Sequence, residues 1–89
     1  MTTTSYIPMT DLECNFYGWA NIAERMEENY KRAYEEQDRE GAEHYLNEWE
    51  QALRVRDYYR KNLTEAMVSN LKNGWLDIDD FETMMKEVY

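Results

Sequence analysis

The sequence is poor in residues that interrupt helices and in residues that form covalent or metal-bound frameworks. Its 89 residues include one proline, three glycines, one cysteine and one histidine. A single cysteine excludes an intramolecular disulfide, and one cysteine with one histidine falls short of the three or four ligands of a zinc site. We therefore expect no disulfide framework, no metal and no cofactor.

Long apolar runs are also missing. No stretch approaches the roughly 20 apolar residues that a membrane-spanning helix needs. The first ten residues, MTTTSYIPMT, have neither the basic segment nor the apolar centre of a secretory signal. These absences predict a cytoplasmic protein with no membrane partner.

Basic residues are few beside the acidic ones. Ten Lys and Arg residues stand against nineteen Asp and Glu residues, for a net charge of −9. Nucleic acids and anionic membranes are polyanions, so this balance opposes direct binding to either and favours a basic protein partner. With 43% hydrophobic residues, the chain has enough apolar surface for one small domain.

The apolar residues that are present recur at helical spacing. From Leu12 to Ala33 they follow alternating steps of four and three residues, which predicts a long amphipathic helix over about residues 11–37. Thr10 and Glu13 have the spacing of a capping box at the start of this helix. Gly18, inside the helix, is expected to allow close packing of another backbone.

A second and a third helix follow. The polar stretch 38–41 predicts a turn in which Gly41 takes a positive φ. Apolar residues at helical spacing then continue over about residues 42–72, and Gly74 is expected to end this second helix. Asp77 is expected to cap a short amphipathic helix that runs to the end of the chain.

These segments define the fold class. Two long helices joined by a short turn run antiparallel, so we predict an all-α fold: an antiparallel helical hairpin of two long helices plus a short C-terminal helix. Residues 10–89 form this single three-helix domain. Residues 1–9, which are polar and rich in threonine, are expected to form a flexible N-terminal arm.

Catalytic patterns are weak in this chain. His44 is expected on a solvated face, and Cys14 is expected to be a half-buried apolar side chain rather than an activated thiol. The sequence has no glycine-rich phosphate loop and no nucleophile elbow, and a small helical hairpin rarely forms the cleft that acid–base chemistry requires. We therefore expect no enzymatic activity and no catalytic residues.

Charge is distributed in blocks along the chain. Residues 24–50 hold ten acids and four bases, residues 51–76 hold two acids and five bases, and residues 77–89 hold five acids and one base. Part of the basic block is expected to pair with acids across the hairpin. Other pairs are expected locally, between Glu50 and Arg54 and between Asp57 and Lys61.

The acids in excess of these pairs suggest a function. Carboxylates three or four residues apart on a helix lie about 5–6 Å from one another, a spacing comparable to that of phosphates along a nucleic acid. A rigid acidic helix can therefore occupy a basic groove that normally holds a polyanion. The candidate partner-binding residues are Glu27, Glu28, Glu35, Glu36, Asp38, Glu40 and Glu43, with a second patch at Asp77, Asp79 and Asp80.

Two other functions are open. Three tryptophans and eight tyrosines exceed what a small hairpin core can hide, so the chain could homodimerise through its aromatic residues as a structural or adaptor subunit. Residues 69–80 also resemble a degenerate EF-hand loop with Gly74 at its central glycine and Asp77 and Asp80 among its ligands. Ser69 and Leu71 occupy positions where calcium ligands are usual.

A resemblance to a known family begins at the run Leu71-Lys72-Asn73-Gly74-Trp75, which is followed by acids and by a helix containing Phe81. This stretch resembles one in the anti-CRISPR proteins, a family of phage-borne inhibitors of RNA-guided nucleases. The likeness covers about fifteen residues, and the strands of that family have no counterpart in this sequence. More broadly the chain resembles small acidic phage proteins of the anti-CRISPR and antirestriction classes. This resemblance implies stoichiometric binding to a host nucleic-acid enzyme in the bacterial cytoplasm, without a cofactor and without catalysis.

Overall fold

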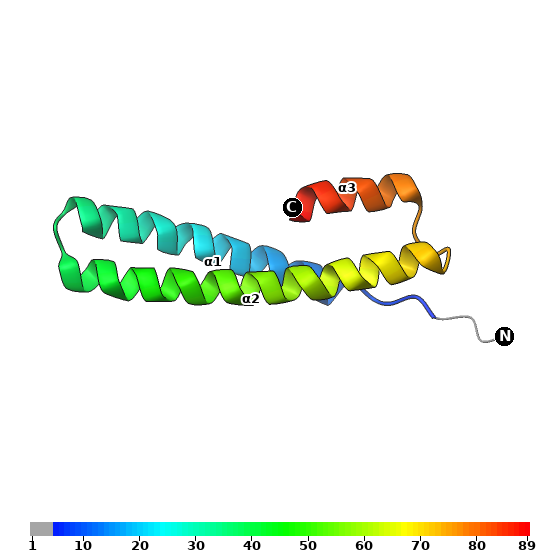
Figure 1. Ribbon diagram of the computed structural model, residues 1–89, viewed down its shortest axis with the longest axis horizontal. Helices are drawn as coiled ribbons and strands as arrows, with labels where there is room; N and C mark the ends of the chain where they lie inside the picture. The colour runs from blue at the N-terminus through cyan, green and yellow to red at the C-terminus, as the bar shows by residue number, and fades with distance from the viewer. Residues whose placement is uncertain (1–4) are drawn as a thin grey trace.

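The computed structural model describes residues 5–89, which form an all-α fold (Figure 1). Helix α1 covers Thr10–Glu35, α2 covers Arg39–Lys72 and α3 covers Ile78–Val88. Helices α1 and α2 form an antiparallel hairpin, and α3 folds back along the second half of α2. The predicted hairpin with a short C-terminal helix is confirmed.

The start of α1 differs from the prediction. Met9, not Thr10, is the N-cap residue, and it makes no side-chain cap hydrogen bond. The Met9 carbonyl accepts from the Glu13 amide at 2.8 Å. The predicted capping box is wrong because Met9 is 6% exposed and packs into the core, which brings Thr10 inside the helix.

The turn between α1 and α2 also lies earlier than predicted. The residue with positive φ is Gln37, at 58°, and not Gly41. The amide of Gln37 donates to the Tyr34 carbonyl at 3.1 Å, and the amide of Asp38 donates to the Ala33 carbonyl at 2.9 Å. This is the Schellman arrangement, which needs a left-handed residue directly after the C-cap.

Gly41 instead takes part in the N-terminal cap of α2. Asp38 is the N-cap residue of this helix, and its Oδ1 accepts from the Gly41 amide at 3.0 Å. A Cβ at position 41 would overlap the Asp38 carboxylate. The glycine therefore makes room for the capping side chain, and its backbone stays helical.

The end of α2 follows the prediction more closely. Gly74 has φ 78° directly after the C-cap Asn73. Its amide donates to the Leu71 carbonyl at 3.2 Å, and the Trp75 amide donates to the Asn70 carbonyl at 2.8 Å. A second Schellman motif therefore ends α2. Asp77 then occupies the N-cap position of α3, without a side-chain cap hydrogen bond.

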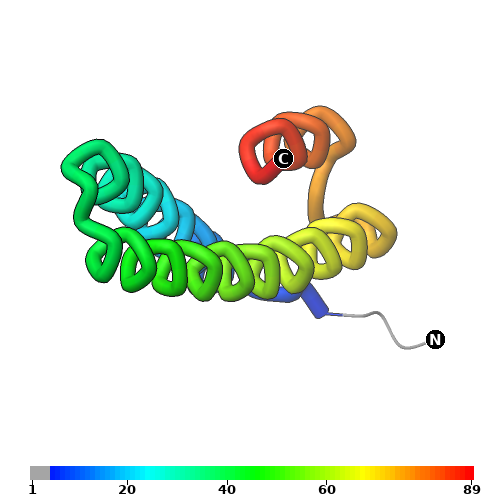
Figure 2. Tube along the Cα trace, turned by 60° about the vertical axis from the view of Figure 1, so that its left-hand side comes forward, coloured from blue at the N-terminus to red at the C-terminus, as the bar shows by residue number. Residues whose placement is uncertain are grey.

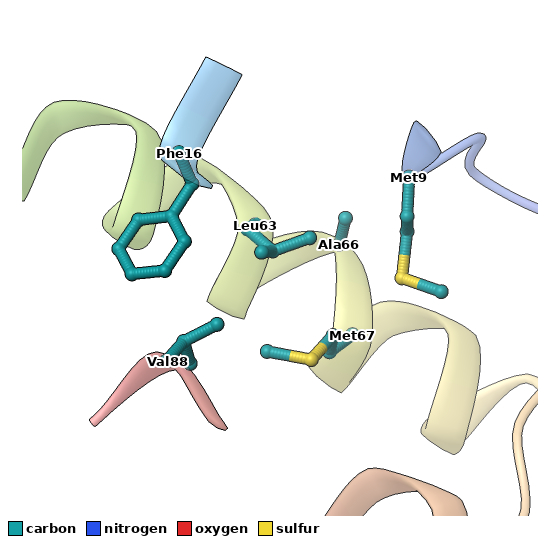
Figure 3. Close-up of a cluster of buried hydrophobic side chains, with 6 residues drawn as sticks. All are labelled: Met9, Phe16, Leu63, Ala66, Met67 and Val88. Atoms are coloured by element: carbon teal, nitrogen blue, oxygen red, sulfur yellow. The ribbon is translucent and has the colours of Figure 1, made fainter. Parts of the chain in front are cut away.

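The hydrophobic core lies where four segments meet, at the end of the hairpin away from the turn. Figure 3 shows its buried side chains directed toward one another from the arm, α1, α2 and α3. Leu63 and Met67 of α2 are fully buried at its centre, and Val88 brings the end of α3 into the same cluster. The six buried members are Met9, Phe16, Leu63, Ala66, Met67 and Val88.

The segment before α1 is attached to this core. Asn70 is 1% exposed and hydrogen-bonds both the amide and the carbonyl of Ile7. Of the predicted flexible arm, residues 1–4 lie outside the described part of the chain. Residues 7–9 are held against α2, because a buried polar side chain and a buried methionine fix them there.

Helix α3 is attached through Arg60 of α2. Its Nε donates to the Val88 carbonyl at 2.6 Å, and its guanidinium lies 5.1 Å from the centre of the Tyr89 ring and 5.5 Å from that of Phe16. A further hydrogen bond of 3.3 Å joins the hydroxyls of Thr64 and Tyr89. These contacts hold the end of α3 over the middle of α2.

The molecule is a rod of 62 × 22 × 14 Å. Its radius of gyration is 17.3 Å, against about 12 Å for a globular domain of this length. Figure 2 shows why: α3 covers one half of the hairpin, and the half that ends in the turn has no third helix. Within residues 5–89, no helix is long and apolar enough to cross a membrane.

The half without a third helix has few buried residues. Its buried side chains are alanines, Ala23, Ala33 and Ala52, whereas its larger apolar side chains stay partly exposed. Gly18 does not pack closely against another backbone within residues 5–89, because a Cβ there would meet nothing within 4 Å.

Candidate functional site

Five of the predicted partner-binding acids lie around the turn of the hairpin. We call this end, comprising residues 35–43, the acidic tip. Helix α1 supplies its last residue, Glu35, the connection supplies Glu36 and Asp38, and α2 supplies two acids in its first turns. All five side chains are exposed: Glu35, Glu36, Asp38, Glu40 and Glu43.

The other two predicted acids of α1 lie further along the same helix. Glu28 is seven residues before Glu35, which places it about two turns from the tip on the same helix face. Glu27 is half-buried, and its carboxylate pairs with Lys31 at 3.0 Å. This hydrogen bond with Glu27, followed by the charge of Glu27, raises the pKa of Lys31.

Few of the tip acids have a cationic neighbour. Glu43 is 3.8 Å from Arg39, and both side chains are largely exposed, so this pair contributes little to stability. Within residues 5–89, no Lys, Arg or His side chain lies within 4.0 Å of the carboxylates of Glu28, Glu35, Glu36, Asp38 and Glu40.

A hollow of about 590 Å³ opens at the tip, between the end of α1 and the start of α2. We call it the tip groove. Its apolar lining comes from two tyrosines of α1 and from Ala42 and Leu46 of α2, and charged side chains stand around them. The full lining is Tyr30, Tyr34, Glu35, Gln37, Asp38, Arg39, Ala42, Glu43 and Leu46.

The tyrosines of the groove belong to a row of aromatic rings. The centre of the Tyr30 ring lies 6.0 Å from that of the Trp49 ring of α2 and 6.2 Å from that of Tyr34, one turn further along α1. Tyr34 ends the row and is 70% exposed. In the sequence, Tyr30 and Tyr34 are four residues apart, as on one face of a helix, but this spacing alone does not indicate a groove.

The second predicted patch lies elsewhere. Asp77, Asp79 and Asp80 are at the start of α3, at the opposite end of the rod from the turn (Figure 1). Asp79 and Asp80 lie in the first turn, where negative charge stabilises a helix through its dipole. The structure therefore does not bring this patch together with the acidic tip.

The basic block does not neutralise the tip. The ion pairs among the described residues all join side chains of one helix, so the predicted pairing across the hairpin is wrong. Asp57 pairs with Arg56 at 2.9 Å and with Arg60 at 3.1 Å, and not with Lys61. The predicted pair of Glu50 and Arg54 is likewise not formed.

The EF-hand hypothesis does not fit the geometry of residues 69–80. The first four of these residues form the last turn of α2, and Asn73 Nδ2 donates back to the Ser69 carbonyl at 2.8 Å. In the described part of the chain, no three or more His, Cys, Asp or Glu side chains are grouped so that they could hold a metal ion. A calcium loop therefore has no structural basis here.

The two reactive side chains considered from sequence lie apart from the tip groove lining. His44 is exposed and packs edge-to-face on Tyr45 at 5.3 Å, as expected of a solvated face. Cys14 is exposed rather than half-buried. The strongest candidate site is therefore the acidic tip with its groove.

Comparisons of this chain with protein-family profiles, with curated proteins and with solved structures give no match.

Proposed function

We propose that this protein is a non-enzymatic inhibitor that binds a basic, nucleic-acid-binding surface of a host nuclease and occludes it with its acidic tip. This is the action implied by the resemblance to small acidic phage proteins of the anti-CRISPR and antirestriction classes. The observation that supports it is the group of exposed carboxylates around one turn, of which Glu35, Glu36 and Glu40 have no cation within ion-pairing distance in the described chain.

The shape of the molecule favours this use of charge. Exposed carboxylates keep their hydration until they meet a partner, so they attract a basic surface over about 10 Å at moderate ionic strength. The tip ends a narrow rod, 22 × 14 Å in cross-section, and can therefore enter a groove. Association driven in this way is fast at low salt and weakens as salt rises.

Charge reversal outside the groove tests the proposal. In the triple variant, Glu28, Glu36 and Glu40 are replaced by Lys, because none of the three lines the tip groove. The matched control replaces three exposed acids away from the tip, Asp11, Glu65 and Glu82, by Lys. Both variants change the net charge by the same amount.

The readout has two stages. Tagged protein is incubated with bacterial lysate and washed at low and then high salt, and the retained nucleases are assayed for DNA cleavage. We expect the original chain to inhibit cleavage stoichiometrically and high salt to relieve this inhibition. The control variant should still inhibit, whereas the triple variant should not. Inhibition by the triple variant equal to that of the original chain would contradict the proposal.

A second candidate function is a homodimeric structural or adaptor subunit. It is favoured by the half of the hairpin that lacks a third helix, where Ile22, Met26, Trp49 and Leu53 are only partly buried. A second hairpin packed there would complete a four-helix bundle. Sedimentation equilibrium distinguishes the two functions: a dimer whose mass the triple variant and high salt leave unchanged favours the subunit.

A further inference from the structure

The tip groove has a composition that selects among basic side chains. Apolar carbon from Tyr30, Tyr34 and Leu46 forms part of its lining, and three carboxylates against one guanidinium give the lining a net negative charge. Simple electrostatic attraction needs only the carboxylates. An apolar, aromatic wall beside them favours a cation that also has a flat, weakly hydrated surface.

The aromatic wall of the groove consists of Tyr30 and Tyr34, and Trp49 of the opposite helix packs against it. Tyr30 lies between Trp49 and Tyr34 in the row of rings, so packing against the opposite helix limits its movement. Tyr34 continues the row by one turn of α1 and leaves most of its surface open. An incoming planar group can therefore extend the row by stacking on Tyr34.

The carboxylates around the wall are available as acceptors. Asp38 uses Oδ1 for the Gly41 amide, which leaves Oδ2 for an incoming donor. Glu43 has a weak neighbour in Arg39, at 3.8 Å and with the Arg39 side chain 92% exposed. Glu35 has no cation within 4.0 Å in residues 5–89.

We propose that the tip groove seats an arginine side chain of the basic partner, with its guanidinium on Tyr34 and its N–H groups directed at Glu35, Asp38 and Glu43. This inference rests on the proposed function and specifies how the tip recognises its partner. Arginine fits better than lysine because its planar group stacks on a ring and offers several donors at once, whereas an ammonium is a compact, strongly hydrated charge.

The experiment uses the full chain and a pair of labelled peptides. One short peptide carries three arginines separated by alanines, and the other carries lysines at the same positions. Binding is measured by fluorescence anisotropy at low salt. The variants are Tyr34→Ala and Tyr34→Phe, with Tyr58→Ala as a matched control because Tyr58 is 63% exposed and lies outside the groove.

We expect the arginine peptide to bind more tightly than the lysine peptide. Tyr34→Ala should weaken arginine-peptide binding by about two- to fivefold, the range of an exposed cation–π contact. Tyr34→Phe keeps the ring and should bind like the original chain, as should Tyr58→Ala. Because Tyr34 is largely exposed, these substitutions leave the fold intact.

Three outcomes would overturn the inference. They are equal binding of both peptides, unchanged binding by Tyr34→Ala, and self-association of the free chain that Tyr34→Ala abolishes, since a second copy would then occupy the groove. Each differs from failure of the proposed function. That failure is seen as nuclease inhibition insensitive to the triple variant, whose substituted residues lie outside the groove.

Discussion

Asn70 holds Ile7 by both polar groups of its backbone. Its Oδ1 accepts from the Ile7 amide at 2.8 Å, and its Nδ2 donates to the Ile7 carbonyl at 3.0 Å. The two residues are 63 positions apart, and within residues 5–89 Asn70 is the one polar residue among the fully buried side chains. One side-chain amide thus joins the segment before α1 to the last turns of α2.

Replacing Asn70 should therefore release this segment. We expect Asn70→Ala to lower the free energy of unfolding by about 1–3 kcal/mol, because both hydrogen bonds and the packing of a buried side chain are lost. Urea unfolding measures the stability, and chymotrypsin cleavage after Tyr6 reports the release. Asn62→Ala, which removes a bond to a carbonyl of its own helix, is the control and should unfold close to the original chain.

Arg60 has the corresponding role for α3. We expect Arg60→Met to lower the free energy of unfolding by about 1–3 kcal/mol, because it removes a charged donor from the Val88 carbonyl and a cation from two rings. Amide hydrogen exchange should accelerate in α3 before it does in α1. Arg54→Met, at an exposed position of α2, provides the comparison. Equal protection of α3 in both variants would contradict this role.

These two anchors mark the limit of what the sequence predicts. The three helices follow from spacing within each segment, because burial of one helix face repeats every three to four residues. From the sequence alone, Asn70 is only a polar residue and Arg60 only a basic residue of a long helix. Their partners lie at the chain ends, and no local pattern links such distant positions.

The same limit applies to the acidic tip: local sequence predicts its acids but not the groove beside them. Its acids lie within nine residues of one another around one turn, positions 35–43, so their clustering follows from the hairpin itself. The groove instead depends on how the rings of Tyr30 and Trp49 meet across two helices. The patch from Asp77 to Asp80 was included because it is acidic, but the length of α2 carries it to the far end of the rod.

Gly18 gives a stabilising prediction. It lies inside α1 with open space around the position of a Cβ. We expect Gly18→Ala to raise the free energy of unfolding by about 1 kcal/mol, because alanine has the higher helix propensity and meets no neighbour. Urea unfolding measures the change. A loss of stability would contradict this expectation, and analytical ultracentrifugation would then test whether a second copy of the chain packs against this position.

Substitutions at the two Schellman turns are expected to change stability in opposite directions. Gln37 holds φ 58° without being a glycine, whereas Gly74 holds φ 78°. Left-handed backbone costs an ordinary L-residue about 1–2 kcal/mol, so Gln37→Gly should stabilise the fold and Gly74→Ala should destabilise it by about that amount. Thermal unfolding of both variants checks the pair. Shifts of the melting temperature in the same direction would contradict it.

Tyr17 gives the fold a dependence on alkaline pH. Its hydroxyl donates to Glu87 Oε2 at 3.2 Å and so connects α1 to α3. Desolvation raises the pKa of Tyr17 most, followed by the hydrogen bond to Glu87 and the charges of Glu87 and Glu13. The folded state therefore keeps this proton to a higher pH than the unfolded chain, in which tyrosine titrates near pH 10.

The sign follows from proton binding. Below about pH 10 the contribution of Tyr17 is fully present, and it is lost as the pH rises through the raised pKa of the folded state. We expect the free energy of unfolding to fall as the pH rises above about 10, and to fall less in Tyr17→Phe, which has no phenolic proton to lose. Tyr58→Phe, an exposed ring outside this contact, controls for the loss of one tyrosine. If the stability difference between the original chain and Tyr17→Phe is the same at pH 8 and at pH 11, the contact between Tyr17 and Glu87 does not couple folding to the proton.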